Sequence, residues 1–210
     1  MRLYRPVFFA QCLYPEALFR IKTSEKSLYL TFDDGPDPDS TPGIILTLQK
    51  YGIKAVFFCN GKNAEQYPYL IEELKNAGHL VGNHGYGHPD GWKTKANEYV
   101  ADVLRANAFT SANLFRPPYG RLTPSQYHRI KDHYRIVFWD IMPYDFDSSF
   151  GEENAVKVFR RNMRSGSIIV LHDKPNSAVK KITERIIISA LREGYYFGDP
   201  FNMQETRLPR

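Results

Sequence analysis

Short apolar segments alternate with longer amphipathic segments from Ser27 almost to the end of the chain. The apolar segments predict strands at 27–32, 53–59, 79–83, 114–116, 134–139, 167–172 and 195–197. The segments between them predict helices at 40–52, 64–77, 94–109, 123–133, 152–164 and 177–193. Strands that alternate with helices form a parallel sheet with the helices packed outside it. The pattern therefore predicts an α/β fold, either an open doubly wound sheet or a barrel, with about seven parallel strands.

The chain has 210 residues and contains no linker rich in Gly, Ser or Pro and no internal repeat. We expect a single domain over 27–210, because this length is sufficient for one large hydrophobic core. Residues 1–26 are expected to form an N-terminal extension that packs on this domain through aromatic side chains.

Composition narrows the class of protein. Hydrophobic residues make up 42% of the chain and charged residues 24%, which is typical of a globular protein. No stretch of about 18 apolar residues occurs, so no membrane span is expected. The formal net charge is +5, but the basic residues are scattered, and no nucleic-acid-binding surface is predicted. The two cysteines are too few for a disulfide framework.

The N-terminus lacks the pattern of a secretory signal peptide. Arg2 and Arg5 precede an apolar stretch, but Gln11 interrupts that stretch, and it reaches Pro15 without a small-residue cleavage site. The sequence thus predicts a cytoplasmic protein by default.

Unusual polar segments follow five of the predicted strands. DDGPD follows the first strand, NHGYGH the third, RPPYG the fourth, DIMPYDFD the fifth and HD the sixth. In a barrel of parallel strands, the loops after the strands lie together at one end and carry the chemistry. We therefore expect these five segments to form one site.

Two histidines in the second of these segments have the spacing of a metal site. His84 and His88 are four residues apart, but the glycines between them and Pro89 after them favour a loop over a helix. A His-x-x-x-His pair also occurs by chance, so this one requires a third ligand.

Asp33 and Asp34 offer that ligand. Turn chemistry explains Asp37 and Asp39, but it does not explain two adjacent carboxylates directly behind an apolar strand. Such a pair is tolerated when a cation or a guanidinium lies close by. One carboxylate with the two histidines would leave open positions for water and substrate, as catalytic metal sites require. The other carboxylate could then act as a base.

The motifs TFDDG, HGYGH, RPPYG, YDF and VLHD, in this order, resemble the five motifs of the polysaccharide deacetylase family (NodB homology domain, carbohydrate esterase family 4). The resemblance extends from residue 27 to about residue 197. It implies a deformed (β/α) barrel and identifies 27–210 as a NodB-like catalytic domain.

The resemblance also implies roles for single residues. Asp33 would be the catalytic base and Asp34 a metal ligand, with His84 and His88 completing the metal site. Arg116 would orient Asp33 by pairing with it. The metal would be one divalent ion, with zinc expected first and cobalt, nickel or manganese as alternatives.

The remaining site residues follow from the later motifs. His172 would be the general acid, and Asp145 would orient it and tune its pKa. The backbone N–H of Tyr119 would help to hold the oxyanion, and Val170 would line the pocket for the acetyl methyl group.

Four positions depart from the family pattern. Gly85 stands where the family usually has Ser or Thr, which removes a hydroxyl that shapes the histidine loop. Met142 replaces an Asp, and Phe146 replaces a Trp as an aromatic wall of the pocket, to which Trp139 could also contribute. Val170 replaces the usual Leu and would slightly enlarge the pocket.

The sequence therefore predicts a metal-dependent hydrolase that removes N-acetyl groups from amino sugars of a glycan, such as peptidoglycan, a chitin-like polymer or poly-N-acetylglucosamine. Family substrates of this kind usually lie outside the cytoplasm. This location disagrees with the cytoplasmic localisation that the N-terminal sequence predicts by default. Two alternatives keep the fold but differ in the bond that is hydrolysed: an O-acetyl ester on xylan, or a small non-sugar amide. A third alternative is a metal-holding module that binds glycans without turnover.

Overall fold

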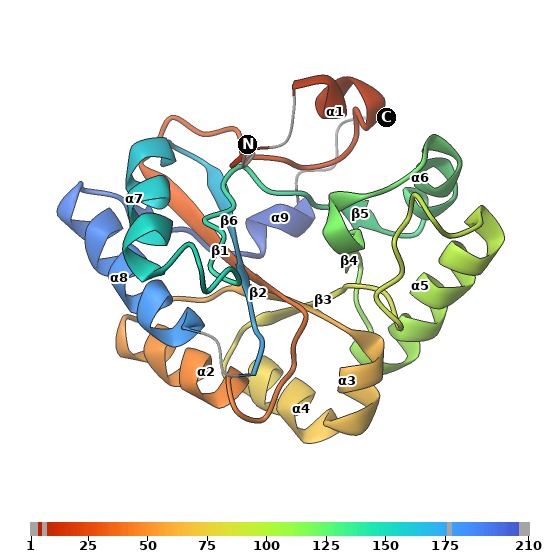
Figure 1. Ribbon diagram of the computed structural model, residues 1–210, viewed down its shortest axis with the longest axis horizontal. Helices are drawn as coiled ribbons and strands as arrows, with labels where there is room; N and C mark the ends of the chain where they lie inside the picture. Colours follow the sequence, from red (N-terminus) through yellow and green to blue (C-terminus); the bar gives the residue numbers. More distant parts are fainter. Residues whose placement is uncertain (1–3, 6–7, 176–177, 206–210) are drawn as a thin grey trace.

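The computed structural model describes residues 4–5, 8–175 and 178–205, and its strands occupy the middle of the molecule with helices around them (Figure 1). The strands are β1 Ser27–Asp33, β2 Val56–Cys59, β3 Leu80–Asn83, β4 Leu114–Phe115, β5 Arg135–Ile136, β6 Ser167–His172 and β7 Tyr196–Phe197. The α-helices are α1 Phe8–Leu13, α2 Thr41–Lys50, α3 Gly61–Gln66, α4 Pro68–Asn76, α5 Ala96–Thr110, α6 Pro124–Ile130, α7 Glu152–Asn162, α8 Val179–Arg192 and α9 Asn202–Glu205.

The seven strands in the described part of the chain run parallel in the order β5-β4-β3-β2-β1-β6, with β7 beside the start of β1. The chain after β5 returns toward β6, because Ile141 bridges Ile169 and accepts a hydrogen bond from the Val170 N–H. The sheet therefore curves into a deformed barrel, and the predicted (β/α) barrel is confirmed.

The two faces of the barrel strands carry different clusters. The outward side chains of β1, including Leu30 and Phe32, pack with α2, α7 and α8 in one apolar cluster. Tyr29 points inward and joins a second cluster with Phe58 and Ile168. Further along β1, the inward positions are occupied by the polar residues Thr31 and Asp33. The interior is thus apolar at one end and polar at the end where the strands finish.

The predicted strand over 134–139 is shorter than expected. Only Arg135 and Ile136 pair as strand β5. The Val137 N–H still donates to the carbonyl oxygen of Phe115 in β4, but the Phe138 N–H donates to that of Leu18. A change of partner of this kind interrupts a regular ladder.

The predicted single helix over 64–77 is wrong, since the segment contains two helices, α3 and α4. Tyr67, between them, has φ −126° and ψ 58°, outside the helical region. The reason is Pro68, which restricts the residue before it and lacks the N–H that would continue the first helix.

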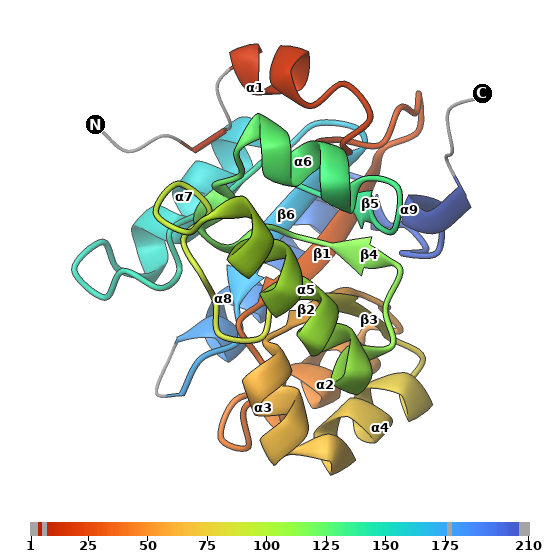
Figure 2. The same cartoon turned by 90° about the vertical axis from the view of Figure 1, so that its right-hand side faces the viewer.

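Residues before β1 pack closely on the barrel. Figure 2 shows α1 above α6. The Phe19 ring stacks on Phe138 with centroids 4.6 Å apart, and Tyr14 lies 5.1 Å from Tyr127 and 5.4 Å from Phe138. These contacts involve described residues of the segment 1–26, of which 1–3 and 6–7 lie outside the described part of the chain.

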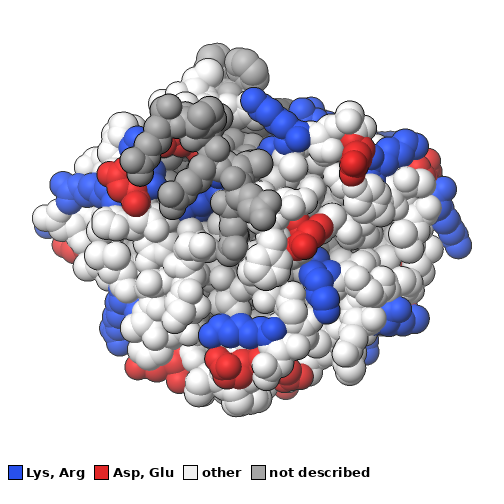
Figure 3. All heavy atoms as spheres, turned by 180° about the vertical axis from the view of Figure 1, so that it is seen from behind, with Lys and Arg blue, Asp and Glu red and all other residues white. Residues whose placement is uncertain are grey.

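The surface and the helices agree with the composition. Within the described part of the chain, none of the helices has both the length and the apolar character needed to cross a bilayer. On the face opposite to that of Figure 1, basic and acidic side chains are interspersed rather than gathered by sign (Figure 3).

Candidate functional site

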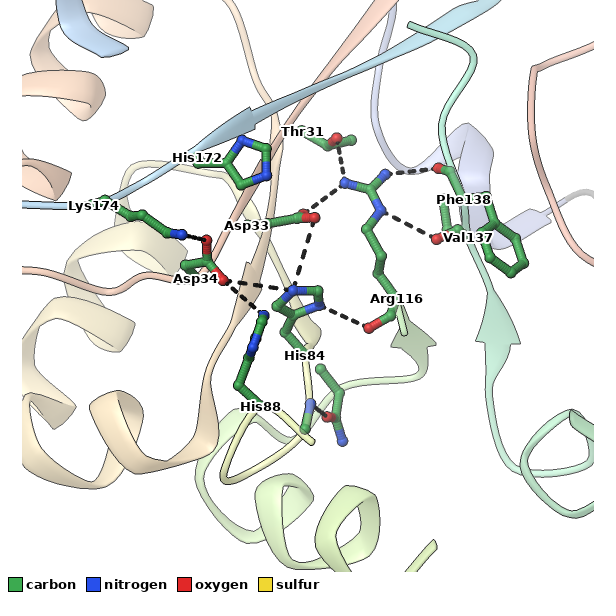
Figure 4. Close-up of polar contacts among 12 residues, drawn as sticks. Thr31, Asp33, Asp34, His84, His88, Arg116, Val137, Phe138, His172 and Lys174 are labelled. Atoms are coloured by element: carbon green, nitrogen blue, oxygen red, sulfur yellow. Dashed lines mark hydrogen bonds and ion pairs between the residues drawn. The ribbon is translucent and has the colours of Figure 1, made fainter. Parts of the chain in front are cut away.

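Figure 4 shows a group of the predicted site residues close together at the end of the barrel where the strands finish: Asp33, Asp34, His84, His88, Arg116 and His172. Asp33 and His172 are the last residues of β1 and β6, and they are register partners on these neighbouring strands. His84 directly follows β3, and Arg116 directly follows β4. The sequence therefore places these side chains together through strand ends that lie far apart along the chain.

Asp34, His84 and His88 form a group that could hold a metal ion. One ligand atom from each residue lies within 4.8 Å of the others. Nε2 of His88 is 3.1 Å from Oδ1 of Asp34, and Nε2 of His84 is 3.7 Å from the same oxygen. Two imidazoles and one carboxylate at this spacing fit a divalent metal ion with open positions.

The orientation and charge of His84 suit a metal ligand. Its Nδ1 lies 2.8 Å from the backbone carbonyl oxygen of Arg116. That oxygen can only accept, so Nδ1 carries the proton and the lone pair of Nε2 is directed toward Asp34. Burial lowers the pKa of His84 despite the nearby carboxylates of Asp33 and Asp34, which favours the neutral imidazole that metals bind.

Asp34 is held as a carboxylate. Burial alone would raise its pKa, but the hydrogen bond with His88 and the electrostatic influence of the nearby His84, His172 and Lys174 side chains outweigh it, and the pKa of Asp34 is strongly lowered. The Lys174 ammonium lies 3.0 Å from Oδ2 of Asp34. Sequence reasoning missed Lys174, because this pairing depends on how the loop after β6 folds back.

The backbone is left-handed at several residues of this end of the barrel. Asp34 has φ 79°, His88 φ 56° and Tyr119 φ 59°, values that non-glycine residues seldom adopt. Outliers of this kind persist where the surrounding structure imposes them, commonly at functional sites. At Asp34 the turn directs its carboxylate to the histidines, whereas Asp33 still points into the barrel.

The loop between the two histidines is fixed by Asp102 of α5. Oδ1 of Asp102 accepts the Tyr86 N–H at 2.7 Å, and Oδ2 accepts the Gly87 N–H at 2.9 Å. Gly85 has φ 76°, and a Cβ there would lie 2.9 Å from Oδ1 of Asp102. The carboxylate of Asp102 therefore shapes the loop in this chain, where the family pattern has a hydroxyl at position 85.

Asp102 was not predicted as a site residue. The available signal was its position in the helix: α5 buries Tyr99, Val103 and Ala106, and Asp102 is adjacent to this buried face. An acidic residue beside the inward face of a helix needs a hydrogen-bonding partner, but the sequence does not show which one.

A buried ion pair fixes Asp33. Nη1 of Arg116 is 2.7 Å from Oδ1 of Asp33 and 2.7 Å from Oγ1 of Thr31. The rest of the guanidinium donates to the carbonyl oxygens of Val137 and Phe138, at 3.1 and 2.8 Å. Arg116 is fully buried. With one oxygen paired to Arg116, Asp33 has its second oxygen 3.9 Å from Nε2 of His84.

A second pair fixes His172. Its Nδ1 lies 3.0 Å from Oδ1 of Asp145, and its backbone N–H donates to Oδ2 of the same carboxylate at 2.7 Å. Burial alone would lower the pKa of His172, but the charge and hydrogen bond of Asp145, with smaller effects of Asp33 and Asp34, raise it. The imidazole is thereby suited to carry a proton toward the mouth of the barrel.

The other four predicted residues surround this centre. Phe146 lies edge-on to His172 with centroids 4.6 Å apart, and Tyr119 lies edge-on to His88 at 4.5 Å. Val170 is buried on β6 opposite Thr31, on the inward side. Trp139 packs beneath the RPPYG loop, because a Cβ at Gly120 would lie 2.5 Å from its ring. The structure thus brings all the predicted site residues to one end of the barrel.

The two carboxylate contacts of Asp102 generate a prediction about the metal. Asp102→Ala removes both acceptors for the loop between His84 and His88, so the two imidazoles lose their fixed separation. We expect metal affinity to fall roughly 10- to 100-fold, as when groups that orient ligands are removed. Competition with a chromophoric chelator measures the change.

The matched control is Glu98→Ala, which removes an exposed carboxylate from the first turn of the same helix. It should bind metal like the parent. Equal affinities for all three proteins would show that Asp102 does not position the histidine loop.

Comparison with known proteins places this geometry in a family. The family model for polysaccharide deacetylases matches residues 20–133. A peptidoglycan-N-acetylglucosamine deacetylase of Bacillus cereus is 34% identical over 153 residues, which cover 70% of this chain and 55% of that protein. A second peptidoglycan-N-acetylglucosamine deacetylase of the same organism is 30% identical, with 85% of this chain and 88% of that protein covered.

The fold agrees with these matches. The crystal structure of the peptidoglycan N-acetylglucosamine deacetylase Bc1960, in complex with 4-naphthalen-1-yl-N-oxidanyl-benzamide, superposes with a TM-score of 0.85 at 27% identity. The superposition covers 94% of this chain and 96% of that one. The chain belongs to the polysaccharide deacetylase family.

Proposed function

We propose that this protein is a metal-dependent hydrolase that removes the acetyl group from N-acetylated amino sugars of a glycan. One observation carries the proposal: an oriented carboxylate, Asp33, and an oriented imidazole, His172, are register partners on adjacent strands beside the Asp34–His84–His88 group. Amide hydrolysis needs a base for the attacking water and an acid for the leaving nitrogen, and this pair offers both.

Asp33 is the proposed base. Its Oδ1 is held by Arg116, so the carboxylate cannot rotate away, and its Oδ2 faces the histidine side of the site. In this position it takes a proton from a water molecule that attacks the acetyl carbonyl. Arg116 does not touch the reacting atoms; it positions the base.

His172 is the proposed acid. Because Nδ1 is bound to Asp145, the other ring nitrogen, Nε2, is the one that can deliver a proton. The raised pKa keeps that proton on the ring at higher pH than for a free histidine, and the leaving amine receives it as the carbon–nitrogen bond breaks. Phe146 is 44% exposed, and its ring lies edge-on to His172, so it would form a wall of the pocket for the sugar.

Asp34, His84 and His88 would hold the divalent metal, and we propose zinc, since two histidines and one carboxylate form a typical catalytic zinc donor set. A divalent ion bound there supplies positive charge that polarises a carbonyl and lowers the pKa of water.

The similar proteins support the substrate class. Two of them are named as deacetylases of N-acetylglucosamine in peptidoglycan. The chain spans about half the length of the first of these, so the substrate of the whole protein is part of the proposal. A glycan-binding module without turnover would need neither the Arg116–Asp33 pair nor the Asp145–His172 pair, which speaks against that alternative.

The two adjacent aspartates provide a direct test of the roles. Asp33→Asn keeps a carbonyl acceptor for Arg116 and leaves all three metal-binding side chains in place. We expect it to retain the metal while acetate release from an N-acetylated oligosaccharide falls at least about 100-fold, the lower range for loss of a general base. Asp34→Asn should instead lose most of its metal, because a two-histidine remnant holds a divalent ion weakly.

Metal content and acetate release are measured side by side on both variants, with circular dichroism to check folding. Acetate release by Asp33→Asn at the parental rate would contradict the assignment. So would loss of metal from Asp33→Asn combined with its retention by Asp34→Asn.

The Asp145–His172 pair predicts a change in pH dependence. The carboxylate of Asp145 raises the pKa of His172, so Asp145→Asn lowers it. An acid is useful only below its own pKa, and the alkaline limb of the kcat profile of the variant should therefore move to lower pH. The profile is recorded on an unactivated N-acetyl glycan, whose leaving group requires protonation.

Asp147→Asn serves as the control, because Asp147 lies in the same loop but its carboxylate accepts hydrogen bonds from Ser149. Its alkaline limb should coincide with that of the parent. If the alkaline limb of the kcat profile does not shift in Asp145→Asn, His172 is not the general acid.

A further inference from the structure

Two exposed aromatic rings extend from the metal-binding group along the surface. Tyr119, which contacts His88, has 60% of its surface exposed, and Trp92 has 66% exposed. Large aromatic side chains that remain this exposed beside a site offer apolar faces to a ligand. None of the steps described above uses Trp92.

Arg121 connects the two rings. Its guanidinium lies 4.9 Å from the centroid of the Trp92 ring and 5.7 Å from that of Tyr119. Asp90 forms an ion pair with Arg121 at 2.5 Å, so the positive charge is balanced locally. Trp92, Arg121 and Tyr119 are called the aromatic strip below. Its faces are apolar and its edges are polar, and Asp90 beside it offsets the charge of Arg121.

The loop that carries Trp92 is fixed rather than loosely attached. The Trp92 N–H donates to Oδ1 of Asp90 at 3.0 Å, and the Thr94 hydroxyl donates to the Asp90 carbonyl at 2.9 Å. The buried side chain of Gln126 donates to the carbonyls of Gly91 and Thr94, at 2.8 and 3.0 Å.

The Trp92 loop and the RPPYG loop are also bound to each other. A Cβ at Gly91 would lie 2.2 Å from the carbonyl oxygen of Arg121, so the two backbones are in close contact. The Asp90–Arg121 ion pair joins the same two loops. The rings are thus held in place before any ligand binds. Binding of a ligand that contacts both rings would therefore cost little entropy for ordering the two loops.

We infer that the aromatic strip is a binding subsite for a further sugar unit of an uncharged N-acetylated glycan chain whose acetylated unit occupies the metal-binding group. This inference rests on the proposed function. Sugar rings have apolar C–H faces that pack on aromatic rings, and equatorial hydroxyls that accept hydrogen bonds from a guanidinium. Because Asp90 balances Arg121, the strip favours an uncharged sugar over an anionic one. The protein would then prefer oligomers over short fragments.

The first test measures binding without turnover. In an Asp33→Asn background, dissociation constants for the hexamer and the dimer of N-acetylglucosamine are determined by calorimetry, with and without Trp92→Ala. We expect Trp92→Ala to weaken hexamer binding roughly tenfold, as for the loss of about 1.4 kcal/mol of aromatic contact. The effect on the dimer should be smaller, because a dimer can bind with the strip empty.

Tyr69→Ala is the matched control, since Tyr69 of α4 is 58% exposed and lies outside the site. It should bind both ligands like the background protein. Equal effects of Trp92→Ala on hexamer and dimer, or no effect on either, would overturn the subsite.

The second test uses the otherwise unmodified enzyme. The ratio of kcat/KM for the hexamer to that for the dimer should fall about tenfold in Trp92→Ala and stay at the parental value in Tyr69→Ala. If the parent releases acetate and the ratio does not change, the subsite is wrong and the proposed function stands. If the parent releases no acetate but Trp92→Ala still weakens hexamer binding, the subsite stands and the proposed function is wrong.

Discussion

The buried guanidinium of Arg116 is the interaction on which the rest of the site depends. It pairs with Asp33, donates to the carbonyls of Val137 and Phe138, and lies 4.2 Å from the ring of Phe58. A buried charge is costly unless it is paired and its donors are satisfied, and here β1 and the chain after β5 satisfy them. The backbone carbonyl of the same residue orients His84. One residue therefore positions both the proposed base and a metal ligand.

Two adjacent carboxylates can have different roles because the backbone turns between them. Asp33 ends β1 and points into the barrel, where Arg116 holds it. Asp34 has a left-handed backbone, and its carboxylate lies against His88 and Lys174. The register of β1 and β6 then brings His172 beside Asp33, and Asp145 holds the imidazole from the other side. The arrangement separates the functions of base, acid and metal ligand among groups that nearly touch.

The sequence predicted the strand ends well because their signals are local. Buried parallel strands give continuous apolar runs, and the polar motifs directly behind them mark the end of the barrel. Contacts between segments that lie far apart in the sequence were harder to predict. No local pattern predicts the ion pair of Lys174 with Asp34 or the hydrogen bond from the Tyr86 N–H to Asp102, because both depend on how distant segments pack. In contrast, the break between α3 and α4 could have been predicted, because Pro68 lies in the middle of the expected helix.

We propose that the Asp34–His84–His88 group and the two oriented pairs together hydrolyse an N-acetyl group. The most direct test is mass spectrometry of N-acetylglucosamine oligomers after incubation with metal-depleted protein and with protein reconstituted with zinc. We expect loss of acetyl groups with the reconstituted protein and no loss with the metal-depleted protein. Reconstituted protein that binds zinc through these three residues and leaves every acetylated oligomer intact would contradict the proposal.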